Sequence, residues 1–153
     1  MKIYFFRHGK ADWPNWNKPD DERPLTKAGK KEVRAVAESL LGLEVCPDHI
    51  LTSPLPRAAQ TAQIAAEYLK MECHEEKLLA PGFSVIELAR LLLKYPGESL
   101  MLVGHEPDFT ETISALTGGS LKLSKAGVAL VDIGDSSRKG KLLWLFPPRI
   151  VQQ

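Results

Sequence analysis

Residues 2–9 read Lys2-Ile3-Tyr4-Phe5-Phe6-Arg7-His8-Gly9. The apolar run over 2–6 is typical of a buried β-strand, and the residues after it predict a loop. Comparable runs lie at 49–52 and 100–103, and each is also followed by polar residues and then by a helical pattern. This alternation favours right-handed βαβ units and a mostly parallel sheet with helices on both faces.

The rest of the chain completes this expected architecture. Helical periodicity or helix-start signals predict helices over residues 26–42, 57–69, 84–95 and 107–116. Two β-rich runs at 128–133 and 142–146, joined by 134–137, predict a C-terminal hairpin. No linker or repeat interrupts the pattern. We therefore expect one α/β domain over residues 1–153, a three-layer α/β/α sandwich with a mostly parallel central sheet.

Composition and charge restrict the possible partners. The 153 residues are 44% hydrophobic and 25% charged, as in ordinary globular proteins. With 20 basic against 19 acidic residues, the net charge of +1 gives no broad field to attract nucleic acid or an anionic membrane. We expect neither as a partner, so any bound anion must be held by a local arrangement of side chains.

The same survey predicts a cytoplasmic protein without a metal or cofactor. The apolar run before Arg7 is too short for the hydrophobic region of a signal peptide. Cys46 and Cys73 have no Cys-x-x-Cys spacing and make no disulfide framework, so we expect reduced thiols. His49 and His74 lie in no ligand motif, and no clustered spacing of metal ligands occurs.

Three polar clusters follow the first three predicted strands, and their side chains suit phosphoryl chemistry. The carboxyl ends of parallel strands lie along one edge of a sheet, where ligand crevices form. We therefore expect Arg7 and His8 to meet Arg57 and His105 there. Arg7 and Arg57 would clamp phosphate oxygens, because a guanidinium offers a planar fork of donors and keeps its charge.

The two histidines receive different predicted roles. A neutral imidazole can attack phosphorus, so His8 is the candidate nucleophile. His105, as an imidazolium, would stabilise the negative charge of the transition state. Gly9, without a Cβ, would let the backbone approach the anion, and Ser53 is a candidate phosphate contact that can also serve only to cap a helix or hold a turn.

These residues also carry a family resemblance over most of the chain. Its motifs are Arg7-His8-Gly9, Thr52-Ser53-Pro54-Leu55-Pro56-Arg57-Ala58-Ala59-Gln60-Thr61-Ala62 and Val103-Gly104-His105-Glu106-Pro107. In this order they resemble the histidine phosphatase (phosphoglycerate mutase-like) superfamily. The short chain and the segment Arg23-Pro24-Leu25-Thr26-Lys27-Ala28-Gly29 are most similar to its SixA-type phosphohistidine phosphatase branch. The resemblance implies a phosphohistidine on His8, phosphate contacts from Arg7, Arg57 and His105, and a position for Arg23 at the pocket rim.

One departure from the wider superfamily bears on the substrate. Members that cleave phosphoesters usually carry a carboxylate acid after the second helix, but residues 79–84 contain no carboxylate. A phosphoramidate nitrogen can leave already protonated, which favours phosphohistidine in a partner protein as the substrate. Other carboxylates remain candidates for the acid: Glu75, Glu76, Glu87, Asp12 and Asp108.

Two further hypotheses stay open at this point. The same pocket could hydrolyse a small phosphorylated compound, with one of those carboxylates as general acid. A non-catalytic module could instead use the arginines to recognise phosphorylated partners, although such a module has no need of His8 as a nucleophile. The loop over 11–25 contains Trp13, Trp16 and Lys18, which could line a substrate entrance or pack against the domain.

Overall fold

The computed structural model describes residues 1–134 and 139–150. Within them a six-stranded sheet has the order β3-β2-β4-β1-β5-β6. Its strands are β1 (Lys2–Arg7), β2 (His49–Thr52), β3 (Cys73–Glu75), β4 (Ser99–Gly104), β5 (Val128–Ile133) and β6 (Gly140–Phe146). The four strands β1, β2, β3 and β4 are parallel to one another, whereas β5 runs antiparallel to both β1 and β6. The mostly parallel sheet and the C-terminal hairpin are thus confirmed; residues 135–138 of the expected connection lie outside the described residues.

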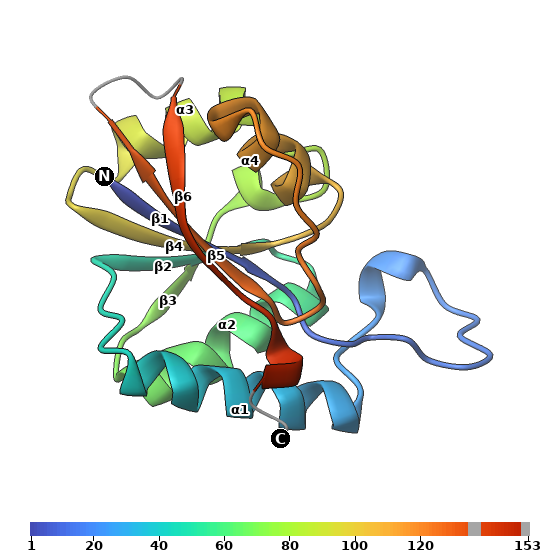
Figure 1. Cartoon of the computed structure of the whole chain (residues 1–153). Helices are drawn as coiled ribbons and strands as arrows, with labels where there is room; N and C mark the ends of the chain where they lie inside the picture. The colour runs from blue at the N-terminus through green and yellow to red at the C-terminus, as the bar shows by residue number, and fades with distance from the viewer. Residues whose placement is uncertain (135–138, 151–153) are drawn as a thin grey trace.

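Helices cover both faces of this sheet, as the sequence predicted (Figure 1). Helices α1 (Lys27–Gly42) and α2 (Pro56–Leu69) lie on one face, and α3 (Val85–Lys94) and α4 (Asp108–Thr117) lie on the other. Because side chains alternate along a strand, β1 serves both layers: Tyr4 and Phe6 join the core under α1 and α2, while Phe5 joins the core under α3 and α4. The α/β/α sandwich follows from these two cores.

Local signals explain where the helices begin. The Thr26 side chain accepts a hydrogen bond from the Gly29 N–H at 2.9 Å and caps α1, whose apolar stripe is buried. Ser84 and Glu87 form a capping box at the start of α3. Pro56 occupies the first turn of α2, where its missing N–H costs nothing.

The sequence analysis missed one strand and three short helices. Strand β3 has three residues at the sheet edge, two of them exposed, so it offers no alternating apolar pattern. The 3-10 helices are η1 (Asp20–Glu22), η2 (Lys77–Leu79) and η3 (Pro148–Ile150), each too short for periodicity to reveal. In the described part of the chain, no helix has the length and apolar character needed to cross a membrane.

Candidate active site

The strand order brings the three polar clusters together. Strand β4 lies between β1 and β2, so the carboxyl ends of these parallel strands are adjacent. Backbone hydrogen bonds continue just beyond the strands, since the His8 N–H donates to the Gly104 carbonyl and the Ser53 N–H to the Val103 carbonyl, both at 3.0 Å. The chain segments that carry the two histidines and Arg57 therefore meet at one edge of the sheet.

A pocket of about 400 Å³ opens at this edge. Five of the seven candidate residues line it: Arg7, His8, Arg23, Arg57 and His105. The rings of the two histidines lie with their centroids 5.3 Å apart. Gly9 and Ser53 are not among the lining residues, and both are buried behind them. Arginines from three separate segments thus surround a pair of histidines.

The hydrogen bond of His8 determines which of its nitrogens is free. Its Nδ1 lies 2.7 Å from the Gly9 carbonyl oxygen, which can only accept, so Nδ1 carries the proton in the neutral ring. Burial, assisted by the charges of Arg57 and Arg7, lowers the pKa of His8 to about 4. At neutral pH the ring is therefore uncharged, and Nε2 keeps its lone pair.

Ser53 positions His105 rather than lining the pocket. The Ser53 Oγ lies 2.7 Å from His105 Nε2 and also accepts a hydrogen bond from the Leu55 N–H at 3.2 Å. Burial first, and then the nearby His8 and Arg57, lower the pKa of His105 to about 3. The imidazolium expected from the sequence is therefore disfavoured in the free protein, because a buried ring beside cations loses its proton readily.

One carboxylate spans two of the arginines. Asp20, in η1 of the long loop, accepts from Arg23 Nε at 2.8 Å and forms an ion pair with Arg57 Nη2 at 3.5 Å. The Asp20 carbonyl also accepts from Arg57 Nη1 at 3.1 Å. Arg7 is held from the other side, where its Nη1 donates to the Leu123 carbonyl at 2.9 Å. Each guanidinium is thus fixed before any anion arrives.

Three polar atoms in the pocket wall are buried without a hydrogen-bond partner among the described residues. They are the Nε atoms of Arg7 and Arg57 and the Nδ1 of His105. Each such atom costs about 1–3 kcal/mol, so folded proteins leave few of them unless a ligand or a function requires it. Their concentration in one pocket is typical of a site built around an anion.

Gly9 is required for packing, in addition to the role that the sequence suggested. A Cβ at this position would lie 2.5 Å from the Val33 Cγ2 of α1, closer than the atoms can approach. The Gly9 N–H donates to Thr61 Oγ1 of α2 at 3.1 Å rather than toward the pocket. The missing side chain therefore lets the segment after β1 pack closely against α1, directly next to His8.

Of the five carboxylates considered as general acids, the structure places only Asp12 in the pocket wall. Its hydrogen bond with Lys125 is the main cause of its lowered pKa, which makes it a poor proton donor. The other four serve elsewhere or face solvent: Glu76 binds Lys94 and Tyr95, Glu87 caps α3, Asp108 accepts from Gly82, and Glu75 is exposed in β3.

Sequence reasoning missed several lining residues: Asp20, Asp21, Pro81, Glu106 and Lys125. Glu106 could have been found, because it directly follows His105; its carboxylate accepts hydrogen bonds from the Thr110 N–H and hydroxyl. Asp20 and Asp21 could not have been predicted from the sequence, since acidic residues in a polar loop are normally solvated. Among residues 1–134 and 139–150, no group of three or more His, Cys, Asp or Glu side chains is arranged to hold a metal ion.

Comparison with known proteins settles the family. Residues 3–80, which include Arg7, His8 and Arg57, match the model of the histidine phosphatase superfamily, branch 1. The chain belongs to this superfamily. An uncharacterized protein of Picosynechococcus sp. is 41% identical over 140 residues, covering 84% of this chain and 82% of the relative. The phosphohistidine phosphatase SixA of Escherichia coli is 28% identical over 155 residues, covering 97% and 94%.

The fold agrees with that of a solved member of the superfamily. The structure of the protein histidine phosphatase SixA complexed with tungstate superposes with a TM-score of 0.87 at 26% identity, covering 99% of both chains. The protein is therefore a SixA-like hydrolase of the histidine phosphatase superfamily.

Proposed function

We propose that this protein removes the phosphoryl group from phosphohistidine in a partner protein, using His8 Nε2 as the nucleophile. The observation that carries the proposal is the bond between His8 Nδ1 and the Gly9 carbonyl. It leaves Nε2 as the nitrogen with the free lone pair in a ring that is neutral at pH 7. Arg7, Arg23 and Arg57 surround this ring and supply the charge that a phosphoryl group needs.

In the first step the substrate's P–N bond breaks as the bond from phosphorus to Nε2 forms. The leaving imidazole already carries a proton on its other nitrogen, so it departs neutral. His8 becomes a phosphorylated, positively charged ring whose Nδ1–H stays bonded to the Gly9 carbonyl. That carbonyl stabilises the charge as it develops, because the bond strengthens when the donor becomes cationic.

In the second step water attacks the phosphohistidine. An oxygen–phosphorus bond forms, the bond to Nε2 breaks, and dihydrogen phosphate leaves while His8 returns to its neutral form. Negative charge spreads over the equatorial oxygens in both steps, and the arginines fixed around them lower the barrier. We assign to His105 the remaining contact with those oxygens, with Ser53 positioning its ring.

Two observations favour a phosphoramidate over an alkyl phosphate. The segment 79–84 has no carboxylate, and the pocket residue Asp12 is held by Lys125 with a lowered pKa. A leaving group that departs already protonated needs no strong acid. The 28% identity to the E. coli phosphohistidine phosphatase over nearly the whole chain points the same way. A cytoplasmic location remains the prediction from the sequence.

One observation supports a small phosphate ester as a second candidate. Glu106 lines the pocket directly after His105, and in its protonated form it would donate a proton to a departing alkoxide. A substrate panel separates the two candidates: the protein, in EDTA, is assayed with a phosphohistidine peptide, an alkyl phosphate and p-nitrophenyl phosphate. We expect turnover of phosphohistidine, and its loss in His8→Asn. Fast turnover of the alkyl phosphate with none of phosphohistidine would favour the ester, and binding of every compound without turnover would favour a non-catalytic module.

A further inference from the structure

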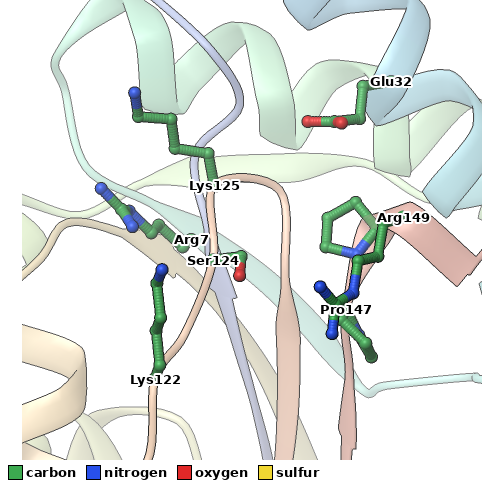
Figure 2. Close-up of a pocket in the computed structure, with 8 residues that line it drawn as sticks. Arg7, Glu32, Lys122, Ser124, Lys125, Pro147 and Arg149 are labelled. Carbon is green, nitrogen blue, oxygen red and sulfur yellow. The ribbon is translucent and has the colours of Figure 1, made fainter.

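A second pocket, of about 320 Å³, adjoins the active site. Arg7 and Lys125 line both pockets, so the two spaces share a wall. Figure 2 shows Arg7, Lys122 and Lys125 on one side of the second pocket and Glu32 and Arg149 on the other. We name this space, defined by its lining residues, the side pocket.

The side pocket concentrates positive charge in a chain that is nearly neutral overall. Four cationic side chains line it, namely Arg7, Lys122, Lys125 and Arg149, against one lining carboxylate, Glu32, among the described residues. Lys125 also pairs with Asp12 of the active-site pocket, so the cations left to attract an anion from solvent are chiefly Lys122 and Arg149. The whole chain has a net charge of only +1. Lys122 and Arg149 are exposed and so can reach a ligand from solvent. A local excess of this kind attracts anions, and the attraction weakens with salt.

The pocket is coupled rigidly to the catalytic strand. The segment between α4 and β5 is held by the Ala126 N–H, which donates to the His8 carbonyl at 3.1 Å, and by the buried Leu123, whose carbonyl accepts from Arg7. On the opposite wall, Pro147 and the buried Pro148 precede Arg149. One wall of the side pocket is therefore hydrogen-bonded to the chain segment that carries Arg7 and His8.

We infer that the side pocket binds an acidic side chain of the same protein that carries the phosphohistidine. This inference rests on the proposed function. The cations come from both walls and share the space with Glu32. Because Glu32 repels a dianion about twice as strongly as a single negative charge, this arrangement favours a carboxylate over a phosphate dianion. The proline wall adds an apolar surface for the chain that bears the carboxylate. The substrate class is thus a phosphohistidine protein with Asp or Glu beside the modified residue.

The test compares two phosphohistidine peptides that differ only in having Glu or Gln at the positions flanking phosphohistidine. Free phosphoramidate serves as a control substrate, because it carries a phosphoryl group but no flanking carboxylate. We expect the parent protein to show a KM about 2- to 30-fold lower for the Glu peptide, the range that two exposed ion pairs provide. The kcat values should agree, because neither flank reaches the reacting atoms.

The Lys122→Ala/Arg149→Ala variant should lose this preference while keeping the parental kcat and phosphoramidate turnover. Both residues are exposed, so the fold should survive. Lys2→Ala/Lys141→Ala is the matched control, since both residues lie opposite Asp132 in the strand register at the other end of the sheet and carry the same total charge. This control should retain the preference. Raising the salt concentration should reduce the preference in the parent.

The possible outcomes separate failure of the side-pocket inference from failure of the proposed phosphatase function. If the parent hydrolyses phosphoramidate and both peptides with equal KM, the inference is wrong and the proposed function stands. If it hydrolyses none of them, both are wrong. A last arm measures inhibition by propane-1,3-diyl bisphosphate against propyl phosphate. The bisphosphate could inhibit more strongly than propyl phosphate only when Lys122 and Arg149 are present, while the parent shows no preference for the Glu peptide. In that case the side pocket binds a small phosphorylated compound, and the inference that it binds an acidic protein segment is wrong.

Discussion

Asp20→Asn is expected to tighten the binding of inorganic phosphate to the active site. In the free protein the Asp20 carboxylate lies 2.8 Å from Arg23 Nε and 3.5 Å from Arg57 Nη2, so a phosphate must compete with it for these donors. The carboxylate side chain is 67% exposed, and each exposed ion pair contributes only about 0.2–1 kcal/mol. Removing two such pairs should therefore lower the Kd for phosphate by about fivefold.

The amide is a conservative replacement at this position. Asparagine can still accept from Arg23 through its side-chain oxygen, and the Asp20 carbonyl that binds Arg57 belongs to the backbone. The Kd is measured by isothermal titration at neutral pH and physiological salt. Asp21→Asn is the matched control, because Asp21 lines the same pocket and its charge acts on Arg57 more weakly than that of Asp20. Unchanged or weaker phosphate binding in Asp20→Asn would show that the carboxylate organises the arginines rather than competing for them.

Three other outcomes follow from the contacts around the histidines. Because the folded pKa of His8 is about 4 against about 6.5 unfolded, stability present above pH 6.5 is lost as the pH falls toward 4. Urea unfolding should show that the His8 ring lowers the free energy of unfolding at pH 5.5 by about 1.4 kcal/mol relative to a pH well above the unfolded pKa. The free energy of unfolding of His8→Asn should fall correspondingly less over the same pH range; an equal fall in both proteins would contradict the lowered pKa of His8. Ser53→Ala should lower kcat about tenfold and alter the NMR titration of His105, and an unchanged titration would refute the positioning role. Gly9→Ala should destabilise the protein by about 1–3 kcal/mol through its clash with Val33, and Gly9→Ala/Val33→Ala should cost less than the sum of the single changes if that clash is the cause.

The sequence was sufficient to predict five of the six described strands, the four covering α-helices, and the histidines and arginines that line the active-site pocket. Those predictions depended on strong local patterns: apolar strands, capped amphipathic helices, and polar residues at strand ends. The strand order then brought Arg57 and His105 to His8, since β4 lies between β1 and β2. Strand β3 was not predicted because three residues at a sheet edge are too few to show an alternating apolar pattern.

Other features depended on packing that no local pattern records. The clash of a Cβ at Gly9 with Val33 arises between distant segments, so the packing role of this glycine could not be predicted from the sequence. The neutral state of His105 follows from burial beside Arg57 and His8, which the sequence does not reveal. Asp20 and the side pocket likewise depend on how loops fold back onto the sheet edge.

The central claim is that a phosphoryl group passes through His8 Nε2, and rapid quenching of a single turnover tests it most directly. The protein is mixed with a phosphohistidine peptide in EDTA, quenched in alkali, and analysed by mass spectrometry. The account predicts a phosphoryl group on His8 that survives alkali, is lost in acid, and is absent from His8→Asn. A phosphoryl group on another residue, or parental turnover by His8→Asn, would contradict it.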